Sequence, residues 1–160
     1  MLLSLELFVM LVLANGAPVV TARVFGRRWS APVDGGRLWR DGRPLLGNSK
    51  TWRGVVSGTL ACGLFALIIG MGLLFGLVFG LLGLIGDMIS SFIKRRAGLD
   101  SSARALGLDQ IPEALLPMIL AWYWLGLNGL VVAGVVVLFT ISNIVLSPLL
   151  FRLGIRHQPH

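Results

Sequence analysis

Hydrophobic residues are gathered in three long stretches that two polar loops separate. The first runs from Leu2 to about Ala22, the second from Gly54 to Ile93, and the third from Ile111 to Phe151. One helix crosses the hydrocarbon core of a membrane with about twenty residues. The second and third stretches are about twice that length, so each has to fold back once. The pattern predicts an all-α polytopic membrane protein with about five transmembrane helices.

Two glycine-containing segments mark the places where the long stretches reverse. Gly70-Met71-Gly72 divides the second stretch, and the segment from Leu125 to Gly129 divides the third, because glycine readily adopts the backbone conformations of tight turns. We expect one membrane-embedded domain over residues 1–160, with cytoplasmic loops at 23–53 and 94–111. The expected spans are 2–22, 54–69, 73–93, 112–125 and 130–151.

Composition supports a membrane protein. Hydrophobic residues make up 56% of the chain and charged residues only 13%, far from the balance of a soluble domain. The stretch from Leu2 to Leu13 has the length of a signal-peptide core, but no basic residue precedes it and the segment from Ala14 to Pro18 is a poor cleavage site. We therefore expect it to be retained as the first span.

The positive charges are not spread along the chain. Eight of the fourteen Lys and Arg residues lie between Arg23 and Arg53, four between Lys94 and Arg104, and two at Arg152 and Arg156. Basic residues flank membrane spans on the cytoplasmic side. This distribution predicts an outside N-terminus and a cytoplasmic C-terminus in the inner cell membrane. It explains the net charge of +7 without a nucleic-acid partner.

Several chemistries are excluded by residue counts. Cys62 is the single cysteine, and the two histidines, His157 and His160, lie at the tail. An intrachain disulfide and a zinc site of the usual Cys and His ligands are therefore excluded. A catalytic triad with an internal histidine is excluded as well.

One carboxylate lies inside a predicted span. Asp87 precedes the end of the third span by about six residues, and Lys94-Arg95-Arg96 follows it. A charged residue at bilayer depth costs roughly 2.5–3.5 kcal/mol on insertion scales and is usually functional. By helical spacing, Asp87, Ser91 and Lys94 or Arg95 share a face. The alternative is a salt bridge within the helix, from Asp87 to Lys94 or Arg95.

Glycines line the same face of the third span. Gly72, Gly76, Gly80 and Gly83 follow one another at steps of four, four and three. Small residues at this spacing let helices approach closely. The face suits a contact within the chain and also a homodimer, so a second copy of the chain stays open as a partner.

A second carboxylate begins the fourth span. Asp109 stands three residues before Pro112, where it can act as a helix N-cap. It also lies at the far end of the loop that follows Asp87, so the two carboxylates can face each other at the membrane surface. Mg²⁺ typically binds one or two carboxylates together with substrate phosphates.

The first loop ends in a basic segment, Gly47 to Gly54. A P-loop requires a Lys directly after its second glycine, and here two residues stand between Gly47 and Lys50. Lys50 and Arg53 at the start of a helix can still bind phosphate, because backbone N–H groups point at an anion there. The alternative is cytoplasmic anchoring of the span, with Trp52 at the membrane interface.

Together these motifs resemble the CDP-diacylglycerol synthase family of membrane cytidylyltransferases, and most closely its archaeal branch, the CDP-archaeol synthase family. The larger family has a second Asp where Pro112 stands here, with Glu113 one residue later. The motifs that carry the resemblance are Gly86-Asp87-x-x-x-Ser91-x-x-Lys94-Arg95, Asn15-Gly16-Ala17-Pro18, Pro32-Val33-Asp34-Gly35, Asp41 to Gly54, and Leu108-Asp109-Gln110.

The resemblance implies a reaction and roles for named residues. A lipid phosphate monoester would attack the α-phosphorus of CTP, and pyrophosphate would leave. Asp87, Lys94 and Asp109 would be catalytic, with Mg²⁺ on Asp87 and Asp109 and with Glu113 as a further candidate ligand. The residues implied for the substrate phosphates are Lys50, Thr51, Arg53, Ser91, Arg95 and Arg96.

Three alternatives stay open. The same chemistry can act on phosphatidic acid or another lipid phosphate in place of an archaeol-type lipid. A transporter or channel would need polar residues near the midplane of several spans, and only Asn15, Asn128 and Asn143 qualify. A non-catalytic membrane scaffold is the third alternative, and Pro112 at the expected acidic position is its main support.

Overall fold

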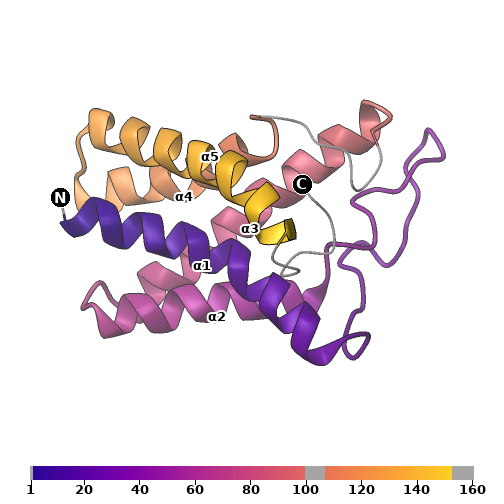
Figure 1. The fold of residues 1–160 in the computed structure, drawn as a ribbon, viewed down its shortest axis with the longest axis horizontal. Helices are drawn as coiled ribbons and strands as arrows, with labels where there is room; N and C mark the ends of the chain where they lie inside the picture. Colours follow the sequence, from indigo (N-terminus) through magenta and orange to yellow (C-terminus); the bar gives the residue numbers. More distant parts are fainter. Residues whose placement is uncertain (1, 100–106, 153–160) are drawn as a thin grey trace.

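The computed structural model describes residues 2–99 and 107–152, and in this part of the chain the fold is all-helical. Five helices run back and forth along one direction (Figure 1). The predicted all-α class with five helices is confirmed, and helix ends differ from the expected ones by at most three residues. The helices are α1 (Leu2–Phe25), α2 (Trp52–Ile68), α3 (Leu73–Arg96), α4 (Gln110–Leu125) and α5 (Gly129–Arg152).

The helices differ in length and apolar character. Helices α1 and α3 have 24 residues each and are apolar enough to cross a membrane by length and composition. Helix α2 and the segment Gly129–Val145 of α5 are shorter apolar helices. Length and composition therefore allow a membrane crossing most clearly for α1 and α3.

Helix α3 lies at the centre of the bundle. It contacts α1, α2 and α4, while α5 packs against α4 and α1. The loop at residues 26–51, the end of α3 and the start of α4 lie at one end of the bundle, and the two short turns lie at the other (Figure 1). The described polar loops thus gather at one end.

Glycines allow α3 to approach its neighbours closely. A Cβ on Gly76 would lie 2.5 Å from the Cys62 carbonyl oxygen of α2, and one on Gly80 would lie 2.8 Å from the Cys62 Cβ. The predicted close packing is confirmed at these two positions. Gly72 does not take part, because it stands before α3 in a turn with φ 91° and has open space around it.

The same face of α3 meets α4 further along. A Cβ on Gly86 would collide with the carbonyl oxygen of Pro112. A Cβ on Gly83 would lie in ordinary contact, 3.5 Å from the carbonyl oxygen of Glu113. Backbone contact at Gly86 therefore fixes the start of α4 beside the segment of α3 that carries Asp87.

Candidate functional site

Asp87 on α3 forms an ion pair with a residue of the long loop. The Lys50 Nζ lies 2.5 Å from the Asp87 Oδ2, and the side chains are 18% and 29% exposed. The alternative of a salt bridge within the helix, from Asp87 to Lys94 or Arg95, is therefore wrong. The loop returns to α3 just before α2 begins and brings Lys50 to the carboxylate.

Asp109 forms a second ion pair, also with a lysine. The Lys94 Nζ lies 2.7 Å from the Asp109 Oδ1, and the side chains are 11% and 24% exposed. Asp109 stands directly before α4, but its side chain makes no capping hydrogen bond there. The N-cap alternative for this side chain is therefore wrong. Ser90 on α3 donates a long hydrogen bond of 3.5 Å to the Asp109 carbonyl oxygen.

The two ion pairs follow each other along one side of α3. Asp87 and Lys94 are seven residues apart, which is about two helical turns and about 10 Å along the axis. Each position pairs with a residue of opposite charge from outside α3, Lys50 from the loop and Asp109 from the start of α4. The predicted gathering of Asp87, Lys94, Asp109 and Lys50 at one end of the bundle is thus present in the structure.

Asp34 organises the loop that delivers Lys50. Its carboxylate accepts hydrogen bonds from the backbone N–H groups of Leu46, Gly36 and Gly47, at 2.9, 3.0 and 3.1 Å. Burial alone would raise the pKa of Asp34, but these N–H donors together outweigh burial and hold its pKa below the ordinary value. The charged Asp34 carboxylate therefore holds three backbone N–H groups of the loop together.

The Lys50 backbone is tied to the segments that Asp34 holds. The Val33 N–H donates to the Lys50 carbonyl oxygen at 2.8 Å, and the Lys50 N–H donates to the Gly47 carbonyl oxygen at 3.3 Å. Sequence reasoning placed Asp34 within a motif of the resemblance and on a solvated basic face of the loop, and it missed this role. The Asp-Gly-Gly sequence after Val33 was the available signal, because Asp and Gly favour turns in which a carboxylate binds nearby N–H groups.

Thr51 and Arg53 make other contacts. The Thr51 Oγ1 accepts a hydrogen bond of 3.2 Å from the Gly54 N–H and so caps α2. The Arg53 Nη1 donates to the carbonyl oxygens of Gly26 and Arg28 at 2.9 and 2.7 Å. Both side chains shape the entry to α2, and their predicted contact with phosphate stays a prediction.

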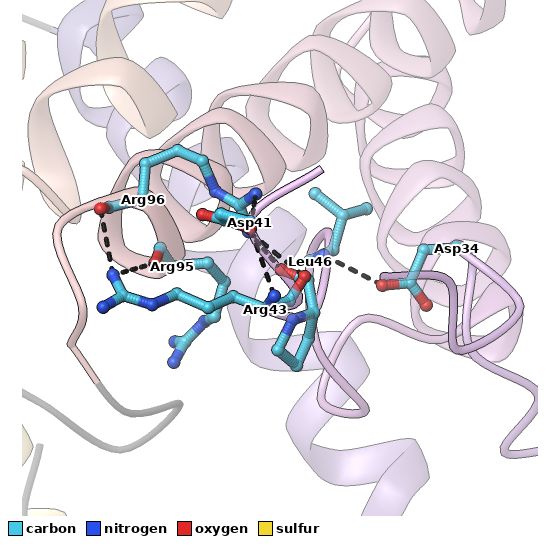
Figure 2. A network of polar contacts seen from close by, with 7 residues as sticks. Asp34, Asp41, Arg43, Leu46, Arg95 and Arg96 are labelled. Atoms are coloured by element: carbon cyan, nitrogen blue, oxygen red, sulfur yellow. Dashed lines mark hydrogen bonds and ion pairs between the residues drawn. The ribbon is translucent and has the colours of Figure 1, made fainter. Parts of the chain in front are cut away.

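Ser91, Arg95 and Arg96 complete the predicted set on α3. Ser91 and Arg95 are buried, with 4% and 6% exposure, and the Arg95 Nη1 donates to the Leu99 carbonyl oxygen. Arg96 instead forms an ion pair of 2.8 Å with Asp41 in the long loop. Figure 2 shows this contact and the neighbouring contact of Arg43 with the end of α3.

The magnesium site that the resemblance implies would lie at Asp87 and Asp109. Within residues 2–99 and 107–152, no three His, Cys, Asp or Glu side chains gather closely enough to hold a metal ion. Glu113, at 9% exposure, therefore does not join Asp87 and Asp109 in a three-residue group. Two carboxylates completed by substrate phosphate oxygens are a set that Mg²⁺ uses. The donor chemistry fits, and the magnesium site stays a prediction.

Comparison with known proteins decides the family. A family model described as CarS-like, CDP-archaeol synthase, matches residues 2–75 and 65–160. The chain belongs to the CDP-archaeol synthase family. The predicted resemblance is confirmed.

Members of the CDP-archaeol synthase family from several archaea are similar to this chain. The protein of Thermococcus kodakarensis is 45% identical over 111 residues, which cover 61% of this chain and 60% of the relative. The protein of Hyperthermus butylicus is 40% identical, with 69% of this chain and 68% of the relative covered. The protein of Methanosphaerula palustris is 36% identical over 84% of this chain and 87% of the relative.

The matched region makes up a different share of each relative. The chain matches 60% of the length of the Thermococcus protein, which is less than two thirds. A solved structure of an intramembrane enzyme for archaeal membrane lipid biosynthesis is also similar, with 30% identity and a TM-score of 0.66 over 86% of this chain and 90% of the other. The fold is thus shared with an intramembrane enzyme.

Proposed function

We propose that this chain is a CTP-dependent cytidylyltransferase of phospholipid biosynthesis that acts on a membrane lipid phosphate. A phosphate oxygen of the lipid forms a bond to the α-phosphorus of CTP, the bond from that phosphorus to the bridging oxygen of pyrophosphate breaks, and a CDP-lipid results. The observation that carries the proposal is the pair of Asp–Lys contacts, Lys50–Asp87 and Lys94–Asp109, at the loop end of an apolar bundle.

The proposed lipid is of the archaeol type, bis-geranylgeranylglycerol phosphate. Family membership supports this choice, because the relatives at 36–45% identity carry the name CDP-archaeol synthase. The bundle has an apolar outer surface on which isoprenoid chains can rest, with exposed residues such as Leu60, Leu64 and Ile89. The lipid tails would stay in the bilayer while the phosphate reaches the ion pairs.

The proposed orientation places the ion pairs at the cytoplasmic face of the inner cell membrane. All five helices would cross the bilayer, with the N-terminus outside and the C-terminus in the cytoplasm. The described loop of residues 26–51 holds many of the basic residues and lies at the same end of the bundle as Asp87 and Asp109. Basic loops favour the cytoplasmic side, where CTP is available.

Charge compensation is the role proposed for the four paired residues. Asp87 and Asp109 would hold Mg²⁺, which neutralises phosphate charge when it is bound. Lys50 and Lys94 neutralise these carboxylates in the structure, and we expect their ammonium groups to turn to the phosphates of CTP and lipid when these bind. Transfer of this kind depends mainly on positioning and electrostatics, so no covalent nucleophile is needed.

The reaction can be tested with the purified protein, labelled CTP, Mg²⁺ and a panel of lipid phosphates. We expect a CDP-lipid with geranylgeranyl-ether glycerol phosphate, and we expect its formation to stop when EDTA is added. A product formed from diacyl phosphatidic acid alone would contradict the archaeol assignment and leave the cytidylyl transfer standing. A well-folded protein that forms no product with any lipid would contradict the proposed reaction.

A further inference from the structure

The tip of the long loop docks on the end of α3 through reciprocal contacts of Asp41, Arg43 and Arg96, which we call the clasp (Figure 2). The Arg96 Nη1 lies 2.8 Å from the Asp41 Oδ1, and the Arg96 Nη2 donates to the carbonyl oxygens of Pro44 and Arg43 at 2.6 and 3.4 Å. One guanidinium thus holds three oxygen atoms of the loop.

Arg43 makes the return contact. Its Nη1 donates to the carbonyl oxygens of Arg96 and Arg95 at 3.2 and 3.4 Å. These are the last carbonyl groups of α3, where the helix dipole favours a cation. Gly98 leaves room for this contact, because a Cβ there would lie 3.0 Å from the Arg43 Nη1.

Aromatic contacts strengthen the docking. The Trp39 ring meets the Phe92 ring of α3 edge-on, with centroids 5.4 Å apart. The Arg96 guanidinium carbon lies 5.1 Å from the Phe92 centroid and 5.9 Å from that of Trp39. Cation–π contacts at these distances are favourable. The loop tip therefore packs on α3 by both charge and aromatic surface.

Helical spacing separates the clasp from the ion pairs. With about 100° of rotation per residue, Asp87 and Lys94 lie on one face of α3 and Arg96 lies about 180° away from Asp87. The loop thus contacts α3 on two opposite faces, through the clasp on one face and through Lys50 on the other. Because Arg96 is bound to loop oxygens on the opposite face, its direct contact with a substrate phosphate bound near Asp87 would be disfavoured.

The clasp connects to Lys50 through the segment held by Asp34. Leu46 and Gly47 follow Pro44 after one intervening residue, Leu45, and their N–H groups donate to the Asp34 carboxylate. The Gly47 carbonyl oxygen in turn accepts the Lys50 N–H. Docking of the loop tip therefore fixes the start of the short segment that carries Lys50. A displaced tip would move the Lys50 ammonium away from Asp87.

We propose that Asp41, Arg43 and Arg96 are positioning residues that hold Lys50 at Asp87, and that Arg96 does not bind substrate phosphate. The inference rests on the proposed cytidylyl transfer. It reassigns Arg96 from the phosphate-binding set that the resemblance implies. Misplacement of a group in a reacting site by about 1 Å can cost about a hundredfold in rate. Loss of the clasp contacts should therefore lower the reaction rate measurably.

The test compares Arg96→Gln and Asp41→Asn in two backgrounds, the wild type and Lys50→Met, with kcat/KM for CTP as the readout. In the wild type we expect each variant to lose about tenfold. In the Lys50→Met background we expect no further loss, because residues that act through one another are not additive. Arg40→Gln, an exposed loop cation outside the clasp, is the matched control and should keep wild-type kinetics.

Two further measurements separate positioning from general destabilisation and from direct binding. Melting temperatures should change little among the variants, while hydrogen exchange in residues 37–50 should become faster in Arg96→Gln. If Arg96 binds phosphate directly, the loss in kcat/KM of Arg96→Gln multiplies with that of Lys50→Met, and Asp41→Asn does not lower activity. These results would overturn the clasp inference. A wild type that forms no CDP-lipid would overturn the proposed function itself, and this inference with it.

Discussion

At the scale of single residues, the ion pairs show what helical spacing can and cannot predict. Spacing placed Asp87 and Lys94 on one face of α3, and the loop between them and Asp109 predicted that carboxylates gather at that end. Helical spacing offered Lys94 or Arg95 as the alternative partner of Asp87, and this alternative is wrong. The true partner, Lys50, is brought to Asp87 by a loop segment whose backbone donates hydrogen bonds to Asp34. Such tertiary contacts leave no periodic trace in the sequence.

Asp34 should make the stability of the protein depend on pH at the acid end. Its native pKa lies below the ordinary value of 3.8, so the carboxylate stabilises the fold above about pH 4, and this contribution is lost as pH falls through the native pKa. The melting temperature of Asp34→Asn should therefore lie below that of the wild type at pH 7, and the gap should shrink below about pH 4. A gap of constant size from pH 7 to pH 3 would contradict this role.

At the scale of elements, the hydrophobic pattern predicted the helices and both turns, but the helix ends depend on polar details. The pattern began the second helix at Gly54, whereas α2 begins at Trp52 because Thr51 caps it. Similarly, α3 continues to Arg96 through three cations, which interact favourably with the carbonyl end of a helix. The hydrophobic pattern cannot predict helix ends that depend on polar residues of this kind.

Gly86 should be sensitive to the smallest added side chain. A Cβ there would collide with the Pro112 carbonyl, and relief of the collision would push α4, and Asp109 with it, away from α3. We expect Gly86→Ala to cost about 1–3 kcal/mol, the usual range for overpacking, and to lower activity. Gly134→Ala in α5 is the control, because nothing lies within 4 Å of its added Cβ, and its melting temperature should match or exceed the wild type. Equal melting temperatures for Gly86→Ala and the wild type would contradict the packing account.

At the scale of the whole molecule, the distribution of basic residues predicted which loops lie together, and the structure places the described parts of those loops at one end of the bundle (Figure 1). Part of the second predicted loop, residues 100–106, and the tail beyond residue 152 lie outside the described residues. The side of the membrane on which the loop end lies follows from charge alone. It therefore calls for a direct test.

Cysteine labelling in sealed vesicles can determine the orientation. Cys62 is fully buried, so the wild type serves as the unlabelled control for a membrane-impermeant maleimide. Arg40→Cys in the long loop should react only from the cytoplasmic side, and Asn128→Cys in the turn before α5 only from the outside. The reverse pattern, or labelling of both from one side, would contradict the proposed topology.

The central claim is that Asp87 and Asp109, each paired with a lysine, form the centre at which CTP and a lipid phosphate react. The most direct measurement is synthesis of CDP-lipid by Asp87→Asn and Asp109→Asn, with Glu6→Gln as a matched change of acid to amide outside the site. We predict losses of about a hundredfold or more for the first two variants, at unchanged melting temperature, and wild-type activity for Glu6→Gln. Wild-type activity in both Asp variants would contradict the account.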